Sequence, residues 1–160
     1  MPGVEGFSPQ GMLHEGWSAE VEDYAIVCGW ILGGKALLVG DVAGGLYLFE
    51  GKSGTPLWQK KEVHKGGLLA LSIHPDGDIF ATSGQDGRVL IWNSEQGEST
   101  NVIELGDGWV EHLRWSPDGR FLAVAFSRRV HVYGIDGHEH WKSGEHPSTV
   151  SSIAWSKSNE

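Results

Sequence analysis

The sequence predicts an all-β protein made of short antiparallel strands. Glycine and tryptophan are abundant, with 24 Gly and 8 Trp among the 160 residues. Short runs of alternating, β-branched and aromatic residues are separated by Gly-containing turns, which is the pattern of β-hairpins. The same pattern returns at a nearly constant interval, and no stretch carries a capped helical pattern of useful length.

The repeat is visible when residues 74–97, HPDGDIFATSGQDGRVLIWNSEQG, are taken as a template. Residues 31–54 match it without a gap, and residues 116–137 match it with two one-residue deletions. The equivalent turn glycines lie 43 and 42 residues apart: Gly34, Gly77 and Gly119. Forty residues further on, Asn159 stands at the same place, and Asn also tolerates the positive φ of such a turn. The chain therefore contains three units and the opening of a fourth.

Each unit is predicted to hold four strands, which are clearest in the second unit. Its first turns are residues 75–77 (Pro-Asp-Gly) and 85–87 (Gln-Asp-Gly), where Pro presets φ and Gly supplies a left-handed position. The predicted strands are residues 68–74, 78–84, 88–92 and, as a weaker pattern, 100–106. A period of about 40–45 residues with four strands per unit is typical of a β-propeller blade.

The pattern PDG…TSGQDGRVLIW of the second unit resembles the WD-repeat β-propeller family, and the resemblance covers roughly residues 21–160. Blades of this family often carry a polar network of a His before the first strand, a Ser or Thr on the second, an Asp in the next turn and a Trp. The resemblance implies that the second unit builds this network from His64, Thr82 (or its neighbour Ser83), Asp86 and Trp92. Its implied role is structural.

The other units depart from this signature, so the repeats are degenerate. The corresponding positions of the first unit are all apolar: Val21, Val39, Ala43 and Phe49. The third unit has Gly106, Val124 and Tyr133, and its Asp turn is shortened to Ser127-Arg128. The pattern returns at His146, which stands nine residues before Trp155, as His64 stands nine before Ile73.

The predicted architecture is a partial ring of three blades plus the first strand of a fourth. The predicted division is a lead-in and possible closing strand at 1–20, blades at 21–63, 64–106 and 107–146, and the opening strand at 147–160. Propellers close with about four to eight blades. The chain is therefore expected to be the N-terminal part of a larger propeller. The alternatives are a homodimer or a second chain that completes the ring, and a four-bladed ring in which residues 1–20 return a strand.

A group of histidines is the one candidate for metal chemistry. His131, His138, His140 and His146 lie within sixteen residues, together with Glu139 and Glu145. On an extended segment the rings of His138 and His140 would face the same way, and two imidazoles with a carboxylate can hold zinc. The simpler interpretation is a surface turn, because His131 lies inside a predicted strand and His146 matches the structural His of the family. The sequence therefore predicts no metal site, with zinc binding as the alternative.

No catalytic constellation is present in the sequence. The Gly-Lys-Ser of residues 50–55 lacks the first glycine of a phosphate-binding loop, because Leu46 stands there, and it falls in a turn between strands. The one cysteine, Cys28, lies in the apolar run AIVCGW, where we expect a buried and inert thiol. We therefore expect no enzyme activity and no cofactor, with an enzymatic propeller that uses the third unit kept as an alternative.

The resemblance also implies a surface for protein partners. In the family, partners usually dock on the face formed by the loops before the first strand and the turns between the second and third. The residues carried onto this face are Lys65, Gln85, Trp109, Glu111, Arg128 and Arg129. Trp109 is the sharpest candidate because it stands at a loop-to-strand junction beside Gly108, although it could instead pack between blades.

Composition limits the other partner classes. The formal net charge is -9 and no basic stripe is present, which argues against nucleic acid. No apolar run approaches the roughly 18 residues of a membrane span, and the N-terminus lacks the features of a signal peptide. We expect a cytoplasmic protein that binds other proteins and neither nucleic acid nor membranes.

Overall fold

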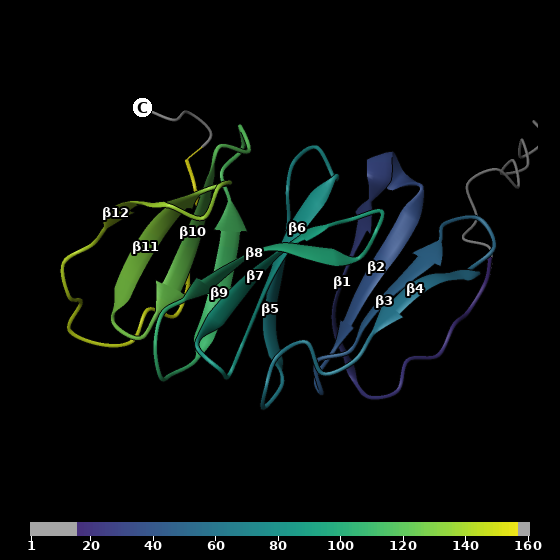
Figure 1. The fold of residues 1–160 in the computed structure, drawn as a ribbon, viewed down its shortest axis with the longest axis horizontal. Helices are drawn as coiled ribbons and strands as arrows, with labels where there is room; N and C mark the ends of the chain where they lie inside the picture. The colour runs from purple at the N-terminus through teal and green to yellow at the C-terminus, as the bar shows by residue number, and fades with distance from the viewer. Residues whose placement is uncertain (1–15, 157–160) are drawn as a thin grey trace, which may run out of the picture.

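The computed structural model describes residues 16–156 and contains three four-stranded antiparallel sheets that stand side by side in an arc (Figure 1). The first sheet holds β1 (Ala25–Ile31), β2 (Ala36–Asp41), β3 (Leu46–Glu50) and β4 (Pro56–Lys60), with the short 3-10 segment η2 (Leu32–Gly34) after β1. The second holds β5 (Leu68–Ile73), β6 (Ile79–Gly84), β7 (Arg88–Asn93) and β8 (Glu98–Glu104). The third holds β9 (Val110–Trp115), β10 (Phe121–Phe126), β11 (Arg129–Gly134) and β12 (Glu139–Lys142).

Each sheet is a simple meander, in which every strand pairs with the next one in the sequence. This is the order that hairpin turns of a few residues impose on antiparallel strands. The three sheets fall within the predicted units 21–63, 64–106 and 107–146, and the four strands predicted for the second unit are present. The all-β blade architecture predicted from the repeat is therefore confirmed.

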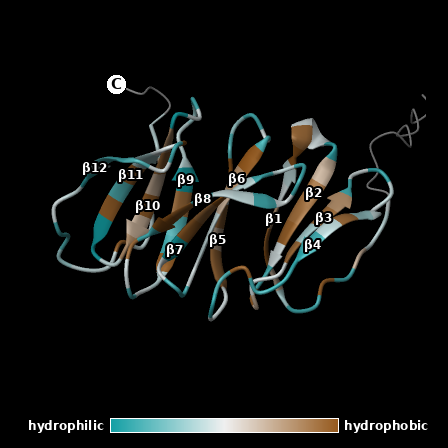
Figure 2. Cartoon of the chain, in the orientation of Figure 1, coloured by the Kyte–Doolittle hydropathy of each residue, from teal (hydrophilic) through white to brown (hydrophobic). Residues whose placement is uncertain are grey.

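The core lies between the sheets rather than within any one of them. Strands of the first and second sheets bury one shared cluster that includes Leu38, Leu48, Leu68 and Phe80. The second and third sheets bury another that includes Ala81, Ile91, Val110 and Leu122. Figure 2 shows apolar residues along the inner strands, while the outer strands β8 and β12 are more hydrophilic. Only the second sheet has a neighbouring sheet on both faces within residues 16–156.

The outer face of the first sheet carries a third, smaller cluster. Val39, Tyr47 and Phe49 are buried there under side chains of the segment that precedes β1. Trp17 and Val21 pack on this cluster, and the Trp17 ring lies 6.1 Å from that of Phe49. The lead-in segment therefore covers the β2 and β3 part of this face.

Cys28 is exposed, so the expected buried thiol is wrong. The expectation rested on the apolar run of β1, but the side of this strand that carries Cys28 and Trp30 points away from the second sheet. Among residues 16–156 no other sheet covers that side.

The predicted opening strand of a fourth blade forms no strand ladder in its described part, residues 147–156. A strand is defined by hydrogen bonds to a neighbouring strand, and the segment runs beside β9 without one. It is anchored at Val150, whose N–H donates to the Ser127 carbonyl, and at Trp155, whose indole N–H donates to the Arg114 carbonyl. Asn159 and residues 1–15 lie outside the described residues, and within 16–156 no helix is long and apolar enough to cross a membrane.

Candidate partner-binding face

A chain of hydrogen bonds joins the four residues of the implied polar network. The indole N–H of Trp92 donates to Thr82 Oγ1 at 2.8 Å, and Thr82 Oγ1 lies 2.9 Å from His64 Nε2. His64 Nδ1 lies 3.0 Å from Asp86 Oδ1. Because an indole can only donate, the hydroxyl proton of Thr82 is left for Nε2, and Nδ1–H then donates to the carboxylate. The neighbour Ser83 does not take part, since its hydroxyl donates to the Val110 carbonyl of the next sheet.

The surroundings of His64 favour the neutral form of its imidazole. Burial lowers the pKa of His64, and the attraction of Asp86 only partly offsets this effect. Burial alone would raise the pKa of Asp86, but hydrogen bonds from His64 and from the backbone N–H groups of Lys65 and Arg88 outweigh it and lower that pKa. The network thus ties the loop before β5 to the turn between β6 and β7.

The first sheet has a different buried polar group, which the sequence reading missed. Asp41 is buried at the end of β2, where its carboxylate accepts the Gly45 N–H at 2.6 Å and the Tyr47 hydroxyl at 2.7 Å. Burial, together with the neighbouring Asp41 carboxylate, raises the pKa of Tyr47. The only signal in the sequence was an Asp directly before the turn VAGG, at a position that the family pattern does not mark.

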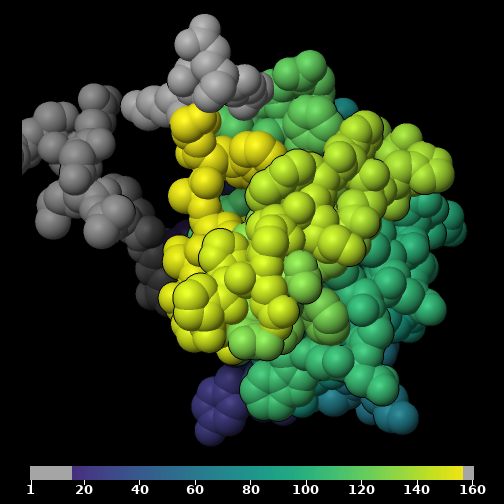
Figure 3. Space-filling view, turned by 90° about the vertical axis from the view of Figure 1, so that its left-hand side faces the viewer, coloured from purple at the N-terminus to yellow at the C-terminus, as the bar shows by residue number. Residues whose placement is uncertain are grey.

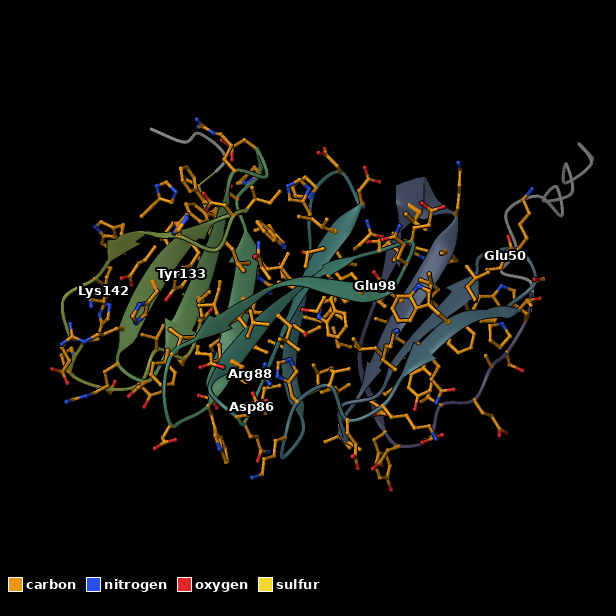
Figure 4. All side chains as sticks on the ribbon, viewed as in Figure 1. Glu50, Asp86, Arg88, Glu98, Tyr133 and Lys142 are labelled. Carbon is orange, nitrogen blue, oxygen red and sulfur yellow. The ribbon has the colours of Figure 1, made fainter. Side chains whose placement is uncertain are left out.

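Three of the predicted docking residues lie together on one face. The Lys65 N–H donates to Asp86, and Gly66 lies against the side chain of Gln85. The loop that leads to Trp109 packs against the same turn, because the Leu105 N–H donates to the Gly87 carbonyl. The side chains of Lys65, Gln85 and Trp109 are exposed, and Trp109 is exposed to 55%. Figure 4 labels Asp86 and Arg88, which mark this edge of the second sheet.

The remaining three candidates are placed differently. Arg128 and Arg129 both reach the carboxylate of Glu145, so one carboxylate offsets part of their positive charge within the chain. Glu111 lies on β9 and lines a cavity of about 200 Å³ between the innermost strands, together with Ile26, Leu69 and Ser152. Arg128 and Arg129 do belong to the loop face, but Glu111 faces the axis of the arc.

The histidines of the third unit do not converge. His131 Nδ1 lies 2.6 Å from Glu139 Oε1, while the His140 ring packs against Phe121. His138 and His146 are exposed. Across the described part of the chain, no three His, Cys, Asp or Glu side chains come together as a metal site.

Comparison with known proteins agrees with this architecture. A family model described as "WD domain, G-beta repeat" matches residues 56–93 and 98–134. These two stretches of the chain are therefore repeats of the WD-repeat family. Each match of the model runs from the outermost strand of one sheet to the third strand of the next, that is, from β4 to β7 and from β8 to β11.

Several curated proteins share parts of the sequence. The p21-activated protein kinase-interacting protein 1-like protein of Gallus gallus is 32% identical over 75 residues, which cover 47% of this chain and 20% of that protein. The 77 kDa echinoderm microtubule-associated protein of Strongylocentrotus purpuratus is 34% identical over 110 residues, 63% of this chain and 15% of that protein. The matches therefore span about a fifth or less of these relatives.

A solved structure of the WD40 repeats of RRP9 superposes with a TM-score of 0.75 at 15% identity, over 82% of this chain and 42% of that chain. At that identity the likeness shows the fold alone. The chain therefore corresponds in fold to less than half of that structure.

Proposed function

We propose that this WD-repeat chain is a non-catalytic protein-interaction module within a larger propeller, and that a protein partner binds the face carrying Lys65, Gln85 and Trp109. The observation that carries the proposal is the 55% exposure of Trp109 beside two loops that are fixed by hydrogen bonds. A large aromatic side chain on a rigid, exposed face is a typical anchor of protein interfaces. A cytoplasmic location remains a prediction from the sequence.

The surroundings of Trp109 support binding without a large rearrangement. His64 and Asp86 hold the loop and the turn on one side of it, and Gly108 packs against Phe126 on the other. Pre-organised loops lose little conformational freedom on binding, so more of the contact energy is kept. Two relatives are themselves named for association with other proteins, a p21-activated protein kinase and microtubules, which is consistent with this class of function.

The test compares Trp109→Ala with Ile135→Ala, since Ile135 is exposed to a similar extent on an outer turn. A protein captured by the wild-type chain is purified and titrated against all three chains by isothermal calorimetry. We expect Trp109→Ala to weaken binding about 30-fold, as for an interface anchor of about 2 kcal/mol, and Ile135→Ala to leave it unchanged. Equal affinities of the wild-type chain and Trp109→Ala would place the binding surface elsewhere.

A further inference from the structure

A polar cavity of about 430 Å³ lies on the loop face, between the first and second sheets. Its walls come from the turn between β2 and β3, the loop before β5 and the start of β7, and the residues that line it are Ala43, residues 62–67 and Arg88. Hydrogen bonds hold the loop on two sides, since the Val63 N–H donates to the Gly44 carbonyl and the Lys65 N–H donates to Asp86. The cavity is therefore formed before anything binds.

Two cationic side chains line the cavity without a hydrogen bond to the rest of residues 16–156. The guanidinium of Arg88 has a buried Nε that meets no hydrogen-bond acceptor in this part of the chain. The carboxylate paired with it, that of Glu104, lies 3.8 Å from Nε, which is longer than a hydrogen bond, and its side chain is 77% exposed. The ammonium of Lys65 has no ion pair or hydrogen bond within the same residues. Both side chains are thus available as donors.

Three other cations of this face have carboxylate partners. Lys61 pairs with Glu22. Arg128 and Arg129 share Glu145 at the third sheet, the end of the arc that faces the viewer in Figure 3. Such surface pairs contribute little to stability, but they reduce the positive charge that a cation presents to a ligand. The cations of the cavity keep more of that charge.

The charges that line the cavity favour a ligand with a single negative charge. Lys65 and Arg88 are offset by one lining carboxylate, that of Glu62, and burial favours the neutral form of His64. Asp86 is not among the lining side chains, and its carboxylate accepts hydrogen bonds from His64 and from two backbone N–H groups. One positive charge is therefore in excess. A carboxylate matches this excess and fits the paired N–H groups of a guanidinium, whereas a doubly charged phosphate exceeds it.

The turn between β6 and β7 connects the cavity to the loop of Trp109. Gly66, which lines the cavity, lies against the side chain of Gln85 in this turn. Gly87 of the same turn lies against the carbonyl of Gly106, in the loop that leads to Trp109. One extended segment of a partner can therefore contact Trp109 and the cavity together. The net charge of -9 repels a strongly acidic segment, so a segment with one acidic side chain is favoured.

We propose that the cavity binds the carboxylate of an Asp or Glu side chain in the protein partner. Arg88 donates two parallel hydrogen bonds to this carboxylate, and Lys65 adds a second positive charge. The inference rests on the proposed function, because it names the chemistry of the segment that binds beside Trp109. A partner segment with an amide at this position leaves Arg88 without a charged acceptor and binds more weakly.

The first experiment selects ligands without assuming a partner. Random short peptides displayed on phage are selected on the wild-type chain, on Lys65→Glu and on Lys35→Glu. Lys35 is the control, because it is exposed in the turn between β1 and β2, at the other end of the strands, and its substitution changes the charge equally. We expect peptides from the wild-type chain and from Lys35→Glu to share an Asp or Glu at one position, and peptides from Lys65→Glu to lack it.

The second experiment compares one selected peptide with a copy in which its acidic residue is replaced by the amide. Both peptides are titrated by isothermal calorimetry against the wild-type chain and against the double variant Lys65→Gln, Arg88→Gln. We expect the amide peptide to bind the wild-type chain about tenfold more weakly than the acidic peptide, and the double variant to bind both peptides equally. Arg88→Gln keeps the backbone N–H that donates to Asp86, and near-ultraviolet circular dichroism checks that the double variant packs as the wild type does.

Titration of Trp109→Ala with the same peptides separates this inference from the proposed function. If Trp109→Ala weakens binding but the amide does not, the interaction face stands and the carboxylate site is overturned. If the amide weakens binding only when Lys65 and Arg88 are present, while Trp109→Ala has no effect, the carboxylate site stands and Trp109 is not the anchor. If no peptide is enriched on the wild-type chain over an empty surface, both proposals are overturned.

Discussion

The imidazole of His64 links the other members of the polar network in the second sheet. His64 has one ring nitrogen against the Thr82 hydroxyl and the other against the Asp86 carboxylate. In the neutral ring the first nitrogen accepts a hydrogen bond and the second donates one. The first and third sheets lack this histidine and fold to the same four strands. The network therefore fixes the loops around one turn rather than the strands themselves.

The lowered pKa of His64 predicts a pH dependence of stability. In the unfolded chain the imidazole titrates near pH 6.5, whereas the folded protein resists protonation to a lower pH. Between these two values the unfolded state binds more protons, so the contribution of His64 is complete above about pH 6.5 and is lost as the pH falls.

We expect His64→Gln to lower the free energy of unfolding by about 1–3 kcal/mol at pH 7.5, where a buried network loses a partner. Urea denaturation should show this gap shrinking at pH 5.5. His138→Gln, an exposed histidine, is the control and should track the wild type at both values. A gap that stays constant with pH would mean that folding does not shift the pKa of His64.

Among the structural elements, the turn after each first strand is what connects neighbouring sheets. His74 Nε2 lies 2.9 Å from the Gly119 carbonyl, and the Leu32 N–H donates to the Gly77 carbonyl at 3.2 Å. Both glycines have positive φ, which a side chain would strain. The equivalent Gly34 has the same kind of φ, +82°, but faces open space.

These turns provide a matched pair of substitutions. Gly34→Ala should cost about 1 kcal/mol, because only the left-handed φ is penalised. Gly119→Ala adds a methyl group that overlaps the buried ring of His74, so we expect about 2 kcal/mol more. Chemical denaturation of the two variants measures the difference. Equal losses would show that the contact between His74 and Gly119 does not hold the sheets together.

Local pattern was enough to predict the strands but not their exposure. The alternating runs and Gly turns of residues 68–106 gave the four strands of the second sheet, because hairpin geometry is decided by neighbouring residues. The burial of Cys28 depends on whether another sheet covers that side of β1. The local run AIVCGW carries no information about such a sheet, so the exposure of the thiol could not be predicted from it. The Asp41–Tyr47 pair was missed because it occurs in one unit only. A comparison of repeats draws attention to positions that the units share, and these two residues are not among them.

For the site, the network of His64, Thr82, Asp86 and Trp92 was accessible through the family resemblance alone. The pairing of Arg128 and Arg129 with Glu145 was not, since it joins a turn to a loop 16 or 17 residues away. The loop sequence was enough to single out Trp109 as a candidate. Its exposure depends on how that loop packs, with Gly106 against Gly87, and this packing is visible only in the structure.

At the scale of the whole molecule, the three sheets form an arc with two open ends. The second sheet is sandwiched, while the first and third each have one face without a neighbouring sheet in residues 16–156. Amide protons exchange slowly where opening a strand exposes a large apolar area. Protection from exchange should therefore be highest in the second sheet and lower in strands at the open ends.

The central claim is that both ends of the arc are open while the second sheet is covered on both faces. Hydrogen–deuterium exchange followed by mass spectrometry tests this claim most directly. We predict that amides of β6 and β7 exchange slowest and that those of β1 and β12 exchange at least tenfold faster, because these strands border the open ends. Protection of β1 equal to that of β5 would contradict the account, since it would mean that the face of Cys28 and Trp30 is already covered in the chain alone.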